Sequence, residues 1–280
     1  MAGEMSEHIQ KLTDLANYFR KQVIKMIYKA QSGHTGGSLS CAEILTALYF
    51  SEMLINPKDC MWEGRDRFIA SKGHCAPMLY AVLAKRGFFP EEELFSLRSL
   101  GSNLQGHPDR NTTKGVEIST GSLGMGLSAG LGMALSARLL GKPYYTYVLL
   151  GDGELQEGQI WESAMTAAKY GVDNCIAIVD NNGVQLDGRI DDIMPLGDLA
   201  SKWRAFGWNA AEVDGHDVRS LLAALSRAKA TKNMPTVIIA KTVKGKGVSF
   251  MEGNYKWHGG TIGKAEYEAA MIELGGDADV

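Results

Sequence analysis

The sequence has few cysteines, no long apolar run and no excess of positive charge. Its only cysteines are Cys41, Cys60, Cys75 and Cys175, and no two of them have C-x-x-C spacing. This pattern excludes a disulfide framework and a cysteine zinc module, and it indicates free thiols in a reducing compartment. The N-terminus is polar, and no apolar run approaches the length of a membrane span. We therefore expect a cytoplasmic protein without a membrane partner.

The overall composition is that of a single globular domain. Basic residues number 29 and acidic residues 32, a net charge of −3 that offers no electrostatic basis for binding nucleic acid. Hydrophobic residues make up 45% of the chain, enough for one large core across residues 1–280. Glycine contributes 33 residues, about 12%, against a typical share of roughly 7%. Such an excess indicates that the backbone approaches something closely at several places.

The centre of the chain has the pattern of a strand, a helix and a second strand. Residues 144–150 are apolar, aromatic and β-branched, as in a buried strand. Residues 159–170 place apolar side chains at helical spacing, and Gly171 follows as a C-terminal cap. Residues 175–179 form another buried-strand run. This order predicts one βαβ unit of a parallel sheet.

Polar turns follow both strands of this unit. Asp152 lies in the turn G-D-G after the first strand, and Asn182 lies in the turn D-N-N-G after the second. In a parallel sheet, ligands bind at the carboxyl ends of the strands, where a helix N-terminus offers N–H groups to phosphate. A carboxylate, an amide oxygen and a backbone carbonyl are ligands that Mg²⁺ accepts. Either turn alone is an ordinary turn, but the pair across one unit predicts a site for Mg²⁺ and a diphosphate.

The remaining segments continue the alternation of helices and strands. Ser40, three residues before Glu43, is expected to cap a helix that runs from about Cys41 to Met53. Residues 101–122 and, from about residue 241, a Gly-rich segment up to residue 260 have no regular period, which is typical of functional loops. The fold class is thus predicted to be α/β, a mostly parallel sheet with helices on both faces. Further helices are expected at 9–30, 41–53, 91–96, 123–140, 218–229 and 264–274, and further strands at 67–71, 208–213 and 236–240.

Histidines are concentrated next to glycines. Four of the six follow a glycine, and a fifth precedes two glycines; these five are His34, His74, His107, His216 and His258. Such loops on a rigid scaffold often carry binding groups. Imidazoles suit a substrate with many hydroxyls and a phosphate, because they donate hydrogen bonds and move protons near neutral pH. A zinc site of three histidines is not supported, because neither H-x-H nor H-E-x-x-H spacing occurs.

The central motif resembles that of thiamine diphosphate enzymes. G-D-G is followed, after 27 intervening residues, by N-N, and the run E-L-Q-E-G-Q-I-W-E-S-A resembles its transketolase form. The resemblance implies the thiamine diphosphate-binding fold, with thiamine diphosphate and Mg²⁺ as cofactors and Ca²⁺ or Mn²⁺ as substitutes for the metal. It further implies that Asp152, Asn182 and the carbonyl of Val184 bind the metal, that Asn182 also contacts the cofactor, and that Gly153 lies against the diphosphate.

Further transketolase-like motifs occur in transketolase order along nearly the whole chain. They are S-G-H-T-G-G-S-L-S, S-K-G-H, Q-G-H-P, T-G-S-L-G-M-G and K-G-K-G followed by W-H-G. Two of them lack a proline that the family commonly has, at Thr35 and Ser122. The resemblance implies catalytic roles for His34, His107 and His258, and cofactor contacts for His74, Gly121, Ser122, Leu123, Glu157 and His258. Glu157 matches an acidic residue near the family's dimer interface, whereas His216 matches no functional position.

The transketolases that this sequence resembles are more than twice as long, and in them a second domain binds the pyrimidine ring. The family takes from that domain a glutamate that activates the cofactor, and we find no candidate for it in these 280 residues. We therefore expect the N-terminal subunit of a split transketolase, which transfers a two-carbon ketol unit from a ketose phosphate to an aldose phosphate. Its partner would be a separate subunit with the pyrimidine-binding and C-terminal domains, in an α2β2 heterotetramer.

Three other functions remain open at this point. The α subunit of a 2-oxo acid dehydrogenase also carries G-D-G and N-N and also needs a partner. A ketol transferase could act on unusual sugars. A non-catalytic, thiamine diphosphate-binding regulatory subunit would keep the cofactor motifs without turnover.

Overall fold

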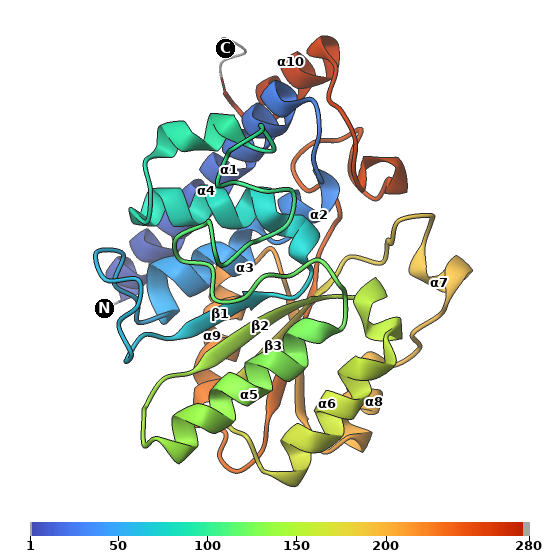
Figure 1. Cartoon of the computed structure of the whole chain (residues 1–280). Helices are drawn as coiled ribbons and strands as arrows, with labels where there is room; N and C mark the ends of the chain where they lie inside the picture. Colours follow the sequence, from blue (N-terminus) through green and yellow to red (C-terminus); the bar gives the residue numbers. More distant parts are fainter. Residues whose placement is uncertain (1, 277–280) are drawn as a thin grey trace.

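A computed structural model describes residues 2–276 of the chain (Figure 1). Its centre is one sheet of five strands in the order β1-β2-β3-β5-β4. All four pairs of neighbouring strands are parallel, so the predicted α/β fold with a mostly parallel sheet is confirmed. The strands are β1 Arg67–Ala70, β2 Thr146–Gly151, β3 Cys175–Asn181, β4 Asn209–Asp214 and β5 Thr236–Lys241.

The central strands β2, β3 and β5 are mainly apolar because both faces of the sheet are buried there. In β2, Tyr147 and Leu149 belong to one hydrophobic core, while Val148 and Leu150 belong to the other. A half-exposed strand would alternate apolar and polar residues, whereas a strand covered on both faces is a continuous apolar run. This is why residues 144–150 could be identified as a strand from the sequence.

The helices divide between the two cores (Figure 1). In this view α1, α3 and α4 lie above the sheet, and α5, α6 and α8 lie below it. The first core contains residues of α1 Ala2–Ala30, α3 Ala42–Ala47, α4 Ala76–Arg86, α9 Val218–Ala230 and α10 Lys264–Glu273, and the second contains residues of α5 Met125–Leu139, α6 Gly158–Lys169 and α8 Leu199–Ala205. Short helical turns complete the fold: α2 Gly36–Leu39, η1 Leu48–Glu52, η2 Gly73–Cys75, η3 Glu91–Ser96, η4 Gly153–Gln156, α7 Ile190–Ile193 and η5 Tyr255–Trp257.

One local prediction was wrong. Ser40 does not cap α3, which has Cys41 at its N-cap and no side-chain cap. The Ser40 hydroxyl instead donates a hydrogen bond of 2.6 Å to the carboxylate of Asp180, because that buried charge requires donors. The turn G-D-G is followed by η4, with Asp152 at its N-cap, and α6 begins at Gly158, one residue before the predicted start. Asp152 therefore lies directly after β2 and not at the N-terminus of α6.

The Gly-rich segment after β5 returns to the loop that follows α1. Gly33 and Gly260 form an antiparallel bridge with backbone hydrogen bonds of 3.1 and 2.8 Å. The N–H of Gly245 donates to the carbonyl of Gly36 at 3.0 Å. These bonds hold two loops that are more than 200 residues apart in the sequence next to each other.

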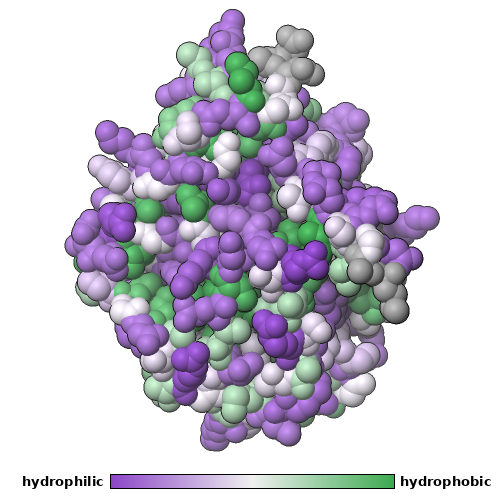
Figure 2. Space-filling model, turned by 180° about the vertical axis from the view of Figure 1, so that it is seen from behind, coloured by the Kyte–Doolittle hydropathy of each residue, from purple (hydrophilic) through white to green (hydrophobic). Residues whose placement is uncertain are grey.

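The surface seen from behind is mainly polar, with small hydrophobic patches between polar residues (Figure 2). Among residues 2–276, no helix combines the length and the apolarity that crossing a bilayer requires.

Candidate active site

A cavity of about 330 Å³ lies at the carboxyl ends of β2 and β3. Its walls come from the segments that follow β1, β2, β3 and β5, from the loop before α5 and from His258, which directly follows η5. Eight of the twelve predicted site residues line it: His74, Leu123, Asp152, Gly153, Glu157, Asn182, Val184 and His258. The other four, His34, His107, Gly121 and Ser122, do not line this cavity, although both histidines lie in ring contact with the cluster that borders it.

The loop that carries Gly121 is held close to two other loops. Gly121 has a φ of 137°, which favours glycine, and a Cβ there would lie 3.2 Å from the ring of His107. On its other side, a Cβ on Gly73 would lie 2.8 Å from the backbone nitrogen of Gly121. Part of the glycine content of the sequence reflects such close approaches of backbone.

Three of the glycine-associated histidines gather around a fourth, His34. The ring centroid of His34 lies 5.8 Å from that of His74, 5.4 Å from that of His107 and 5.7 Å from that of His258. The rings of His74 and His258 are 4.9 Å apart. These four residues come from separate segments of the chain. Only the fold brings them together as one histidine cluster.

His216 lies apart from this histidine cluster. Its Nε2 accepts a hydrogen bond of 2.9 Å from the backbone N–H of Val243, so the proton must be on Nδ1 when the ring is neutral. Nδ1 then donates to the carboxylate of Glu43 at 3.0 Å. Both ring nitrogens are thus used in hydrogen bonds within the fold. This agrees with the sequence analysis, in which His216 matches no functional position of the family.

The surroundings favour neutral rings in the histidine cluster. Burial and then the nearby Arg98 guanidinium lower the pKa of His34 to about 4. Burial and then the Lys244 ammonium lower the pKa of His258 to about 3. The pKa values of His74 and His107 are also lowered, chiefly by burial. At neutral pH the four rings can therefore both accept and donate hydrogen bonds.

We expect acidification to destabilise the fold through this cluster. The folded-state pKa values are depressed, so below about pH 6.5 the unfolded chain binds protons that the folded chain does not. The free energy of unfolding should fall as the pH drops from about 6.5 towards 4, by at most about 1.4 kcal/mol per pH unit for each such histidine. Urea denaturation at several pH values measures this slope. His74→Asn should reduce it, while the same change at the remote His8 should not; equal slopes would contradict the explanation.

The predicted metal ligands occupy neighbouring turns. The carboxylate of Asp152, with 3% of the residue exposed, accepts backbone hydrogen bonds from Gly153 at 2.8 Å and Gly183 at 2.5 Å. The amide oxygen of Asn182 accepts one from Val184 at 3.1 Å, while its amide nitrogen donates to Asp180. This second bond determines which way the amide faces and leaves its oxygen as the atom available to a cation.

The chemistry of these oxygens fits a bound divalent cation. Burial, followed by the charge of Asp180, raises the pKa of Asp152 to about 6, so a buried negative charge here is costly without a positive partner. A carboxylate, an amide oxygen and a carbonyl are hard ligands that Mg²⁺ accepts together with phosphate oxygens and water. Across residues 2–276, no cluster of three or more His, Cys, Asp or Glu side chains forms a metal site.

Comparisons with known proteins agree with this geometry. The family model described as "Transketolase, thiamine diphosphate binding domain" matches residues 11–280.

The chain belongs to the transketolase family.

Relatives of this transketolase chain include subunits of about its own length. It is 44% identical over 270 residues to the 6-deoxy-6-sulfo-D-fructose transketolase subunit of a Clostridium strain, covering 96% of this chain and 98% of the relative. It is 43% identical over 255 residues to one of the apulose-4-phosphate transketolase subunits of Phocaeicola vulgatus, covering 91% and 90%. Human transketolase is 40% identical over 269 residues, but there the match covers only 42% of the longer protein.

Solved transketolase structures share the fold. The structure of the Leishmania mexicana enzyme superposes with a TM-score of 0.92 at 32% identity, covering 96% of this chain and 42% of that chain. A Pichia stipitis transketolase mutant in complex with xylulose 5-phosphate gives a TM-score of 0.91 at 31% identity, covering 96% and 41%. The relatives of similar length imply that a transketolase of this kind works with a partner subunit.

Two buried lysines in transketolase-like motifs were not predicted as site residues. Lys72, in S-K-G-H, is fully buried and pairs with Asp180; burial alone would lower its pKa, but the charge of Asp180 raises it. Lys244, in K-G-K-G, donates to the carbonyl of Val184 at 2.9 Å and contacts His258 Nδ1 at 2.8 Å. Burial and then Lys72 lower the pKa of Lys244 to about 8. Their positions within the motifs were the available signal.

Arg98 is a third charged residue that the sequence did not indicate. Its guanidinium lies 3.2 Å from Nδ1 of His34 and donates to the hydroxyl of Ser32 at 2.9 Å. It therefore adds a positive charge to the histidine cluster. No glycine, histidine or quoted motif residue adjoins it in the sequence, so only the tertiary structure places it here.

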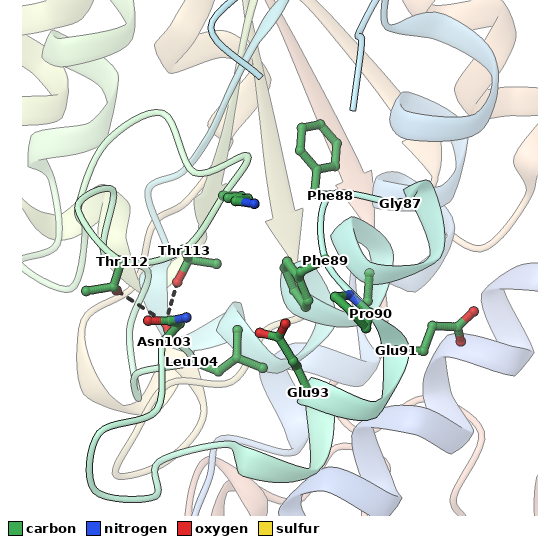
Figure 3. A pocket seen from close by; sticks show the side chains of 12 residues that line it. Gly87, Phe88, Phe89, Pro90, Glu91, Glu93, Asn103, Leu104, Thr112 and Thr113 are labelled. Carbon is green, nitrogen blue, oxygen red and sulfur yellow. Dashed lines mark hydrogen bonds between the residues drawn. The ribbon is translucent and has the colours of Figure 1, made fainter. Parts of the chain in front are cut away.

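A larger cavity lies elsewhere in the molecule. It has a volume of about 560 Å³ and lies between the end of α4, η3 and residues 103–114 (Figure 3). Phe89 and Leu104 form its apolar wall, and the hydroxyls of Thr112 and Thr113 both donate to the carbonyl of Asn103. None of the predicted site residues lines this larger cavity. Cavity volume alone would therefore not have pointed to the predicted site.

Proposed function

We propose that this chain is the diphosphate-binding subunit of a two-subunit transketolase. It transfers a two-carbon ketol unit from a ketose phosphate to an aldose phosphate, with thiamine diphosphate as cofactor. The observation that carries the proposal is the meeting of Asp152, Asn182 and the histidine cluster around one cavity, in a chain whose subunit relatives have about the same length. In this proposal the whole chain, residues 1–280, acts as one diphosphate-binding domain.

The proposed cofactor site follows from the donor set. Asp152, Asn182 and the carbonyl of Val184 bind Mg²⁺, for which Ca²⁺ or Mn²⁺ can substitute. Asn182 would also contact the cofactor, and Gly153 would lie against the diphosphate. The carbonyl of Val184 is the partner of Lys244, and metal binding would require it to share or exchange that contact. Cofactor contacts are proposed for His74, Gly121, Ser122, Leu123, Glu157 and His258, of which Gly121 and Ser122 lie outside the lining of the cavity.

The proposed mechanism uses the histidine cluster on the substrate side. Thiamine diphosphate, when bound, would supply the carbon nucleophile that adds to a ketone, so that the adjacent carbon–carbon bond can be cleaved. His34, His107 and His258 orient the sugar hydroxyls and move protons to and from them, which their neutral rings allow. Arg98 adds a permanent positive charge beside His34. The three histidines are proposed to act as general acids and bases, and the histidines and Arg98 as hydrogen-bond donors.

We further propose that the missing parts of the active site come from a separate subunit. That subunit carries the pyrimidine-binding domain and the glutamate that activates the cofactor, and two copies of each chain form an α2β2 heterotetramer. Glu157 is exposed at the rim of the cavity. We propose that it lies near the dimer interface. A cytoplasmic location is in keeping with four cysteines that are all free thiols.

A coupled assay on the chain purified from its own cells tests this function. Xylulose 5-phosphate and ribose 5-phosphate serve as donor and acceptor, with thiamine diphosphate and Mg²⁺ added. We expect ketol transfer only in fractions where a second chain co-elutes. Turnover by the isolated chain would contradict the need for a partner, and no turnover by a complex that retains cofactor would contradict the choice of sugars.

Ketol transfer between unusual sugars is the second candidate function. It is favoured by the names of two relatives, which refer to 6-deoxy-6-sulfo-D-fructose and to apulose 4-phosphate. The same complex assayed with these two donors beside xylulose 5-phosphate separates the candidates by their relative kcat/KM. A preference of more than about tenfold for either unusual sugar would replace the first candidate.

A further inference from the structure

Glu154 is a buried carboxylate whose hydrogen-bond partners come from three different segments. Only 2% of the residue is exposed. One carboxylate oxygen accepts hydrogen bonds from the hydroxyl of Ser71 and from the backbone N–H of Gly124, the latter at 2.9 Å. The other oxygen accepts from the N–H of Gly151, also at 2.9 Å. All three partners are donors, so this arrangement suits an ionised carboxylate, which only accepts.

Each of these partners directly adjoins a wall of the cavity. Ser71 follows β1 and precedes Lys72 and His74. Gly124 follows Leu123, and Gly151 precedes Asp152 at the end of β2. Ser71 and Gly124 are 53 residues apart in the sequence, and Gly124 and Gly151 are 27 apart. The carboxylate of Glu154, which itself lines the cavity, joins the three segments at one point.

The packing around this point leaves little freedom for the three segments to move separately. The first turn of α5 lies directly on Ser71, because a Cβ on Gly126 would overlap the Ser71 side chain. Gly124 has a φ of 85°, a conformation that favours glycine, and its N–H points to Glu154. If the carboxylate lost an acceptor, a buried N–H or hydroxyl would lose its partner without water to replace it.

We propose that Glu154 is a positioning residue for the cofactor site: it holds the loops of His74, Leu123 and Asp152 in the register that the diphosphate and its metal require. The inference rests on the proposed function of this site. Glu154 acts through its neighbours and is not assigned a chemical step.

Glu154→Gln tests the proposal on the full chain. The amide keeps the shape but replaces one acceptor oxygen by a donor, so at least one of the three donors loses its partner. We expect thiamine diphosphate, titrated by calorimetry in saturating Mg²⁺, to bind about 10- to 100-fold more weakly, the range found when groups that orient metal ligands are removed. In the active complex, the apparent KM for the cofactor should rise in proportion while kcat at saturating cofactor is largely kept.

Ser71→Ala is a second variant for the case in which Glu154→Gln does not fold. It removes only one donor to Glu154, and we expect a smaller loss of cofactor affinity in the same direction. Ser163→Ala is the matched control, because Ser163 is also buried but its hydroxyl donates within its own helix, to the carbonyl of Gln159 at 2.8 Å. The control should keep the cofactor affinity of the unchanged chain.

The outcomes separate this inference from the proposed function. If the unchanged chain, alone and with its co-eluting partner, binds no thiamine diphosphate, the proposed function itself fails. If it binds and both Glu154→Gln and Ser71→Ala bind equally well, Glu154 has no positioning role. If Ser71→Ala and Ser163→Ala lower cofactor affinity and melting temperature to the same degree, the effect is one of general stability and the inference is overturned.

Discussion

Asp152→Asn is expected to abolish retention of thiamine diphosphate and Mg²⁺, and with it ketol transfer. The carboxylate is the only charged group in the proposed set of metal ligands, and it is buried beside backbone donors that fix its orientation. An amide there is neutral, and its nitrogen would face an N–H group or the metal. Removing groups that merely orient metal ligands costs about 10- to 100-fold in affinity, so the loss of the ligand itself should exceed about 100-fold.

Cofactor binding by calorimetry in Mg²⁺ and ketol transfer by the coupled assay both measure this effect. Asp192→Asn is the matched control, since it makes the same chemical change at an exposed position in α7 outside the cavity. The control should bind cofactor like the unchanged chain. Full activity of Asp152→Asn would show that the central motif has been misread.

His34→Gln is expected to lower turnover by about 10²- to 10⁴-fold while cofactor binding stays close to normal. His34 lies at the centre of the histidine cluster and contacts Arg98, but it does not line the cavity of the predicted metal ligands. Glutamine can donate and accept hydrogen bonds but cannot transfer a proton near neutral pH. The loss should therefore appear mainly in kcat, in the complex at saturating cofactor.

The same variant distinguishes a catalytic chain from a regulatory one. A non-catalytic, cofactor-binding chain would show no dependence of turnover on His34. His8→Gln provides the control, because His8 lies on α1 outside the cavity lining, where its ring contacts the hydroxyl of Ser51 at 3.2 Å. If His34→Gln retained full kcat, the proposed proton transfer through the histidine cluster would be wrong.

Much of the fold could be predicted because its signals are local. Residues 175–179 are apolar without interruption and form β3 Cys175–Asn181, since a strand covered on both faces needs no polar positions. Residues 159–170 repeat apolar side chains at helical spacing and form α6 Gly158–Lys169. Gly171, with a φ of 54°, ends that helix as expected. In each case, the residues that determine the element lie within it or next to it.

The error at Ser40 arose because a distant residue decided the local structure. Ser40 has the side chain and spacing of a helix cap, but its hydroxyl binds Asp180, which is 140 residues away. Burial alone would raise the pKa of Asp180, and it is Lys72, together with hydroxyl donors such as Ser40, that keeps it low. A buried charge recruits donors from wherever the fold brings them, and this competition is not visible in a local pattern.

The sequence by itself determined the order of the elements, the turns that carry Asp152 and Asn182, and the placing of histidines on glycine loops. It also determined the chemical kind of site, because carboxylate, amide and imidazole groups were recognisable from their motifs. Only the tertiary structure decided that His34, His74, His107 and His258 meet, that Lys244 and Arg98 adjoin them, and that Glu154 joins three loops. These contacts link segments that are far apart in the chain, and whether such segments meet depends on the packing of helices against the whole sheet.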